Sequence, residues 1–187
     1  MTELKHPSKI RIIEPLLTLV VFGVAAIYML NVFNTGNWFW FRGTTTEINP
    51  SRIVIVENGE RTLLQPGAAN FETISMAVQD SLAKFSNSDL INIGLSERTM
   101  QDYESESLIV EIYFDRPIQF NTLARTGEPT QLLIPIDGRH ANGRYVFRGD
   151  KGEWWFGAIR MADPSALYTA LQQMGYTAAV FDVESAS

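Results

Sequence analysis

Residues 15–33 read PLLTLVVFGVAAIYMLNVF, and this apolar stretch determines how the rest of the chain is interpreted. It contains no charged residue and approaches the roughly 20 residues with which an α-helix crosses a bilayer. Pro15 suits the first helical turn, where a missing N–H is tolerated, and the hydroxyl of Thr18 can bond back to the helix backbone. The stretch therefore predicts a transmembrane helix over residues 15–33.

Charged residues before the span predict its orientation. Three are basic and two are acidic: Lys5, Lys9, Arg11, Glu3 and Glu14. Because segments with an excess of Lys and Arg stay in the cytoplasm, we expect residues 1–14 to form a cytoplasmic tail. The C-terminal part of the chain is then extracytoplasmic, in the periplasm or at the cell surface.

A cleaved signal peptide is the main alternative to a membrane anchor. The apolar run is longer than the usual signal-peptide core of about 7–15 residues. Bulky residues also occupy positions 31–34, where cleavage would need small ones. We therefore favour an uncleaved signal anchor. A buried helix of a soluble protein fits less well with the basic flank before the run and the aromatic cluster after it.

Side chains in and after the span indicate contacts with lipid and with other helices. Four aromatic residues follow it: Trp38, Phe39, Trp40 and Phe41. We expect them to form an aromatic belt at the outer membrane interface, the alternative being that they begin the folded core. Within the span, Gly23, Ala25 and Ala26 are small enough for a neighbouring helix to approach closely.

Composition excludes several function classes. The chain has 187 residues and no cysteine, which excludes disulfide bonds, thiol chemistry, iron–sulfur clusters and zinc–thiolate sites. The two histidines, His6 and His140, lie in different contexts and do not suggest a metal site. A net charge of −6 argues against non-specific nucleic-acid binding. We expect no cofactor, no metal and no nucleic-acid partner.

Residues 34–49 are predicted to be a juxtamembrane tether and residues 50–187 an outer domain. The tether contains Gly43 and three consecutive threonines, which form helices poorly, and it ends at Pro50. Removing the three basic and two acidic residues of 1–33 from totals of 15 and 21 leaves 12 and 19, a net charge of −7. The outer part is therefore acidic.

The outer domain begins with a predicted hairpin and helix. The Asn-Gly pair at 58–59 separates the β-branched and apolar runs 52–57 and 61–64, which is a strong signal for a two-residue hairpin. Apolar residues then recur at spacings of three and four over 71–85. This spacing predicts an amphipathic helix, with Asn70 as its cap.

The middle of the domain contains two further predicted strands and an acidic segment. Residues 90–95 favour a short strand and residues 108–114 a strong one. The polar stretch 96–107 is interpreted as an exposed loop or as one or two helical turns. Residues 132–136 form the next predicted strand, and Pro135 suggests that this strand lies at a sheet edge.

The C-terminal part predicts the remaining elements. Residues 132–136, 144–148 and 153–160 favour an antiparallel meander. An acidic cap followed by proline predicts a helix over 163–174, and residues 178–181 a last strand. The predicted fold class is α+β, with a mainly antiparallel sheet and two helices on one face.

The sequence contains no nucleophile motif and no P-loop, so a non-catalytic protein is expected. His140 shares a turn-rich segment with Asp137, which favours a solvated hairpin loop over a hydrolytic site. The acidic run 102–106 is interpreted as solvated rather than as a calcium site, because it lacks the spacing of an EF-hand. Glu111 interrupts an apolar strand, and alternation places it on an outward face.

A surface for partner binding is predicted on the meander. Trp154 and Trp155 are adjacent in a strand, so their side chains point to opposite faces and cannot both enter one core. The ring left outside would offer contact area to a partner, a ligand or the membrane, unless a loop or the tether covers it. Arg144, Arg148 and Arg160 are expected to add polar anchoring on the same meander.

These features favour a non-catalytic accessory or scaffolding subunit of a larger membrane complex. Its partners would be other integral membrane subunits and the lipid bilayer, and a respiratory or photosynthetic electron-transfer assembly is one candidate host. One alternative is an extracytoplasmic regulator of a sensor kinase or transporter. A second is a weak ligand-binding or hydrolytic module that uses His140 and the acidic loops.

Overall fold

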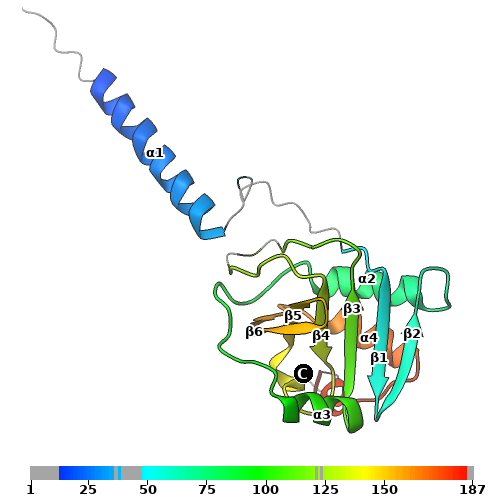
Figure 1. Cartoon of the computed structure of the whole chain (residues 1–187). Helices are drawn as coiled ribbons and strands as arrows, with labels where there is room; N and C mark the ends of the chain where they lie inside the picture. Colours follow the sequence, from blue (N-terminus) through cyan, green and yellow to red (C-terminus); the bar gives the residue numbers. More distant parts are fainter. Residues whose placement is uncertain (1–12, 36–37, 39–47, 121, 123, 185–187) are drawn as a thin grey trace, which may run out of the picture. The chain divides into compact units, whose positions relative to one another are not determined.

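The structure is a computed structural model that describes residues 13–35, 38, 48–120, 122 and 124–184. The chain forms two compact units, Met1–Phe41 and Arg42–Ser187, and each is described by itself. The first contains the helix α1 (Ile13–Thr35), and the second contains the α+β domain (Figure 1).

Helix α1 is long and apolar enough to cross a membrane. Its segment Ile13–Phe33 has a mean hydropathy of 2.3, and only 6% of the most apolar window is buried. The Thr18 hydroxyl donates to the Glu14 carbonyl at 2.9 Å, and the Asn31 amide donates to the Ile27 carbonyl at 2.9 Å. Its polar side chains are thus satisfied within the helix, as a lipid environment requires. The predicted helix is confirmed, and its exposed apolar surface is that of a membrane anchor or a signal sequence.

The residues expected to contact lipid and other helices are described only in part. Trp38 is exposed, and its carbonyl accepts a hydrogen bond from the Tyr28 hydroxyl at 2.7 Å. The other three aromatic residues, 39–41, lie outside the described residues, so the aromatic belt stays a prediction. The three small residues of the span are exposed on α1: Gly23, Ala25 and Ala26.

One six-stranded sheet organises the α+β domain, with the order β2-β1-β3-β4-β5-β6 and every neighbouring pair antiparallel. The strands are β1 (Arg52–Glu57), β2 (Glu60–Leu64), β3 (Leu108–Tyr113), β4 (Gln131–Pro135), β5 (Tyr145–Asp150) and β6 (Glu153–Arg160). The hairpin between β1 and β2 and the meander from β4 to β6 are both confirmed. At the hairpin turn, Asn58 and Gly59 have φ angles of 49° and 87°, as a turn that matches the sheet twist requires.

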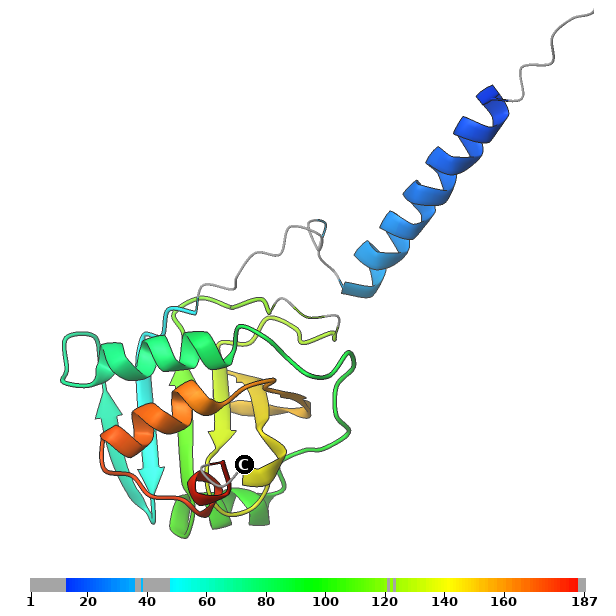
Figure 2. The same ribbon diagram turned by 180° about the vertical axis from the view of Figure 1, so that it is seen from behind.

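The two faces of this sheet have separate apolar cores. Helices α2 (Phe71–Ser81) and α4 (Ser165–Gln173) pack together on one face, here called the α2/α4 face (Figure 2). Their core includes Ile74 and Leu171 against Ile112 and Leu132. The opposite face, here called the α3 face, carries a smaller core around the fully buried Tyr103 of α3 (Glu97–Ser105). The α+β class with two helices on one face is confirmed.

Several sequence-based expectations differ from the structure at element ends. Helix α2 stops at Ser81 instead of continuing to residue 85, and Asn70 has a left-handed φ of 67° with no side-chain cap. Residues 90–95 do not form a strand, because only Ile91 bridges to Ala158 at the outer edge of β6. The chain after α2 runs beside β6, and it therefore turns away from the axis of α2.

Two further differences concern the ends of the sheet. Pro135 does not mark an edge strand, since β4 lies between β3 and β5. Its missing N–H is tolerated because β5 pairs with β4 only from Gln131 to Leu133. Residues 178–181 are not a strand: helix α5 (Ala179–Glu184) forms there, and the ring of its Phe181 packs 5.3 Å from that of Tyr168.

The expectation that Glu111 faces outward into solvent is wrong. Alternation does place it on the α3 face, but the residue is only 4% exposed. Its carboxylate accepts hydrogen bonds from the Arg61 guanidinium at 2.6 Å and from the Tyr113 hydroxyl at 3.0 Å. Burial and the adjacent Glu111 carboxylate raise the pKa of Tyr113 to about 12. The carboxylate is thus held inside the sheet by a cation from two strands away.

Loss of Arg61 should therefore destabilise the domain. Arg61→Ala leaves the buried Glu111 carboxylate without its cation, and we expect a loss of about 2 kcal/mol in the free energy of unfolding. The loss is smaller than for a fully buried ion pair, because half of Arg61 is exposed. Urea unfolding followed by circular dichroism in detergent would measure it. Arg98→Ala, at an exposed position of α3, is the control. Equal losses in the two variants would contradict the role given to Arg61.

Candidate functional site

The five residues predicted to bind a partner lie on β5, β6 and the loop before them, and the structure separates them into two groups. Trp154 and Trp155 are both half-buried. Trp154 packs against the apolar cluster of the α3 face, whereas Trp155 lies beside Arg148 and Gly127. The next residue, Phe156, is the most exposed aromatic of this run, at 66%.

A β-bulge explains this arrangement. Phe147 pairs with Ala158 and Gly149 with Trp154, so Arg148 on β5 faces several residues of β6. Gly157 in the bulge has a φ of 88°, which favours glycine, and an added Cβ would lie 3.1 Å from Leu90. Bulges change the direction of side chains along a strand. Simple alternation from the sequence therefore could not place Phe156.

Arg148 lies inside the fold, where a docking partner cannot contact it. The residue is only 2% exposed. Its guanidinium donates to the Thr126 carbonyl, to Phe156 O at 3.2 Å and to Gly157 O at 3.1 Å. No carboxylate among the described residues pairs with it, and its Nε has no hydrogen-bond partner. Burial lowers the pKa of this guanidinium. Arg148 therefore joins the 115–130 loop to the β6 bulge.

Arg144 and Arg160 do come together, at the end of the meander where β5 begins and β6 ends. The Arg160 guanidinium donates to the Gly143 carbonyl at 3.2 Å and to the Tyr145 hydroxyl at 3.4 Å. Its central carbon lies 5.4 Å from the centre of the Tyr145 ring. Arg144 accepts a backbone hydrogen bond from Met161 at 3.0 Å. The two arginines are thus fixed in neighbouring positions.

His140 lies at the same end of the domain. Its Nδ1 is 2.7 Å from the hydroxyl of Tyr103, which also donates to the Arg139 carbonyl at 3.1 Å. A phenol has one proton, so this network favours an Nδ1–H that donates to Tyr103 and leaves Nε2 as the acceptor. Burial, followed by the charge of Arg139, lowers the pKa of His140. The segment 137–143 connects β4 to β5, and within it the His140 side chain is half-buried and hydrogen-bonded.

The backbone around His140 is constrained. His140 and Arg144 have φ angles of 69° and 52°, in the left-handed region that side-chain-bearing residues rarely adopt. Left-handed residues other than glycine gather at functional sites. Arg139 extends toward α3, where it donates to the Thr99 hydroxyl at 3.3 Å and lies 3.9 Å from the Asp102 carboxylate. We call Arg139, His140, Arg144, Tyr145 and Arg160 the basic end.

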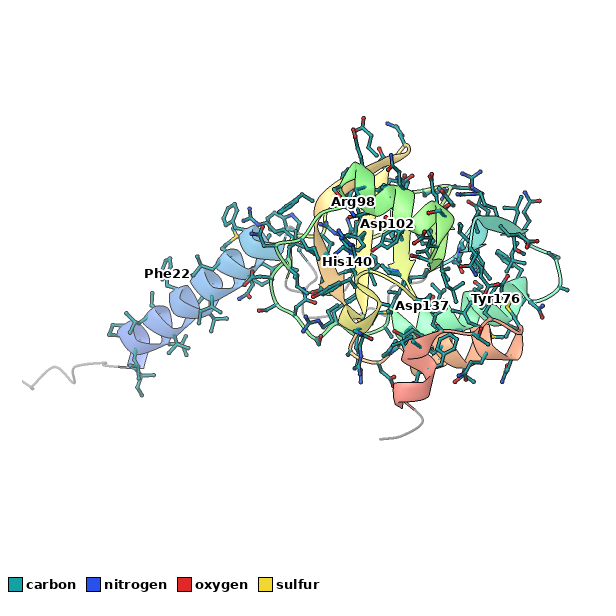
Figure 3. The ribbon with its side chains drawn as sticks, turned by 90° about the horizontal axis from the view of Figure 1, so that it is seen from below. Phe22, Arg98, Asp102, Asp137, His140 and Tyr176 are labelled. Carbon is teal, nitrogen blue, oxygen red and sulfur yellow. The ribbon has the colours of Figure 1, made fainter. Side chains whose placement is uncertain are left out.

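Two of the acidic candidates, Asp102 and Asp137, lie close to the basic end or at its border. Figure 3 shows Asp102 and Arg98 near His140 on the α3 side, with Asp137 and Tyr176 further toward the α2/α4 face. Asp137 accepts a hydrogen bond from the Gly138 backbone at 2.8 Å and lines a hollow with Tyr176. The described residues contain no group of three or more His, Asp or Glu side chains placed to hold a metal ion.

The chain matches no protein-family model, no curated protein and no solved structure.

The lowered pKa of His140 predicts how stability depends on pH. The unfolded chain takes up a proton at the ordinary value near 6.5, whereas the folded protein does so only at lower pH. The free energy of unfolding should therefore fall as the pH drops from 7 through 6.5, and less steeply in His140→Gln. Nuclear magnetic resonance of the His6→Gln variant would give the His140 pKa directly. We expect a value below 6.5 that rises in Arg139→Ala, and a value of 6.5 or above would contradict the network.

Arg148 predicts a second effect, on the 115–130 loop. Arg148→Met leaves three carbonyls without a donor, so we expect a loss of about 3 kcal/mol in unfolding free energy. Arg148→Lys should be no better, because the single nitrogen of lysine cannot take the places of the two guanidinium nitrogens that make these bonds. Hydrogen exchange would show lost protection at the Ile118 and Thr130 amides. Arg160→Met is the control at an exposed arginine, and unchanged exchange in Arg148→Met would refute the joining role.

Proposed function

We propose that this chain is a non-catalytic single-pass membrane protein that acts as an accessory or scaffolding subunit of a larger membrane complex. The observation that carries the proposal is the exposure of α1, of whose most apolar window only 6% is buried. An apolar helix of this length is stable only in lipid or against other apolar helices. The small exposed side chains of Gly23, Ala25 and Ala26 would let such helices approach closely.

The outer domain would dock its partner through the meander. The basic end carries Arg139, Arg144 and Arg160, of which Arg160 lies over the Tyr145 ring, in a part of the chain whose net charge is −7. Arginine with a neighbouring aromatic ring is the combination enriched at energetically important interface positions. Phe156, exposed in the middle of β6, adds apolar contact area. A carboxylate-rich segment of another subunit would fit the basic end.

In this proposal the basic N-terminal tail is cytoplasmic and the outer domain extracytoplasmic. Residues 1–14 carry the excess of lysine and arginine that orients such a span. A respiratory or photosynthetic electron-transfer assembly is one candidate host. The protein would then stabilise the assembly and would carry no electrons itself.

Co-purification tests the subunit role. The protein is solubilised from native membranes in mild detergent, captured through a C-terminal tag and analysed by quantitative mass spectrometry. We expect a fixed set of integral membrane proteins in near-equal amounts. The double variant Arg144→Glu/Arg160→Glu should reduce their recovery at least about tenfold, which corresponds to 1.4 kcal/mol.

Lys151→Glu is the matched control, because it reverses a charge in the turn at the other end of β5 and β6. Its recovery should equal that of the unaltered protein. Capture of the tagged chain alone would reject the subunit role and favour a transient regulator. Equal recovery with the double variant would reject the basic end as the docking surface.

A further inference from the structure

The two edge strands of the sheet, β6 and β2, differ in whether another segment of the chain covers them. The outer edge of β6 is covered by the chain after α2. Ile91 and Ala158 exchange backbone hydrogen bonds at 2.9 and 3.0 Å, and the Gly157 amide donates to the Ile93 carbonyl at 2.8 Å. Phe85 adds a second bridge, to Met161. Covering an edge in this way prevents it from pairing with another chain.

The opposite edge, β2, has no such cover among the described residues. β2 pairs with β1 alone and lies at the outer side of the sheet (Figure 1). All five residues of β2 lie opposite residues of β1, and the two-residue turn makes Glu60, Thr62 and Leu64 the hydrogen-bonded positions. Glu60 directly follows the two-residue turn, so its backbone N–H and C=O point toward β1. The backbone groups of Thr62 and Leu64, at every second position after it, do the same. The amides and carbonyls of Arg61 and Leu63 therefore point away from the sheet.

Three of the usual protections of an edge strand are absent from β2, although the strand is short and its first residue, Glu60, is charged. Its register with β1 is continuous, without a bulge, and it contains no proline. The one cationic side chain, Arg61, is drawn across β1 to the Glu111 carboxylate at 2.6 Å and so does not guard the edge. Leu63 remains 52% exposed beside it. An edge strand whose outward backbone groups have no partner is a site for strand addition.

We propose that β2 pairs antiparallel with β2 of a second copy of this chain, centred on Thr62. In this register Arg61 lies opposite Leu63 of the second copy, and the reverse, so all the outward backbone groups of both strands are bonded. Thr62 lies opposite Thr62, a favourable cross-strand pair. Glu60 lies opposite Leu64, so no like charges meet.

The strand is compatible with its own copy in hydrogen bonding, charge and side-chain type together. The interface of two five-residue strands is small, but anchors in one membrane raise the effective concentration of the two domains. The inference is independent of the proposed subunit role, because it concerns contact between identical chains.

A single introduced cysteine tests the register, because the native chain contains none. Thr62→Cys places two thiols in a non-hydrogen-bonded pair, where Cα atoms lie about 4.5 Å apart, within disulfide range. Mild oxidation of the full chain in its native membranes should convert most of it to a covalent dimer. Glu60→Cys is the matched control on the same strand. Its counterpart lies about 13 Å away in this register, so its dimer yield should be at least about fivefold lower.

A second variant blocks the edge without touching the hairpin. Leu63→Pro removes an outward N–H and no bond to β1, as edge strands tolerate. Added to Thr62→Cys, it should lower the dimer yield at least about fivefold, while Leu63→Ser should lower it less. Circular dichroism would verify that the domain remains folded. Equal yields from Thr62→Cys and Glu60→Cys would overturn the proposal, as would full cross-linking of a folded Leu63→Pro variant.

Discussion

The α+β domain depends on the burial of its central strand, β3, on both faces. A strand covered on one side can alternate apolar and polar residues, but β3 is buried from Leu108 to Ile112 and must be satisfied on both sides. Helices α2 and α4 supply one cover and α3 the other. The single carboxylate in this strand, Glu111, can remain only because Arg61 and Tyr113 bond to it. The need to cover the second face therefore explains both α3 and the ion pair.

Elements with strong local signals could be predicted from the sequence, and those that depend on tertiary contacts could not. The Asn58-Gly59 turn, the apolar helix and the turn at Asp163 before α4 each depend on residues that are close together in the sequence. Hydrogen bonds from the Ser165 hydroxyl at 2.5 Å and the Ser165 amide at 2.9 Å lower the pKa of the Asp163 carboxyl group. By contrast, α3 buries only Thr99 and Tyr103, too few residues to show a helical period in the sequence. Residues 90–95 have strand-like composition but serve to cover an edge, which composition does not reveal.

The candidate site was predictable to the same extent. Arg144 and Arg160 are expected on one meander, and in the structure Arg160 lies over the Tyr145 ring while the Arg144 carbonyl accepts a hydrogen bond from Met161. Arg148 follows the same alternation but lies opposite a bulge, and the 115–130 loop covers it. No feature of the sequence around Arg148 distinguishes it from its two neighbours. The His140 side chain is fixed by a hydrogen bond with Tyr103, a residue 37 positions away in sequence. Local sequence patterns therefore describe His140 only as part of a loop.

The same arginine links the stability of the sheet to the state of its edge. A charged residue on an edge strand normally discourages pairing, because its side chain stays beside the exposed backbone. Arg61 instead neutralises Glu111 two strands away, and the distance of 2.6 Å leaves its guanidinium committed to that carboxylate. Satisfying the buried charge therefore removes the guard from β2. At the other edge, the chain from Phe85 to Ile93 covers β6 through backbone hydrogen bonds. A core requirement on one face thus leaves one edge of this sheet, and not the other, able to add a strand.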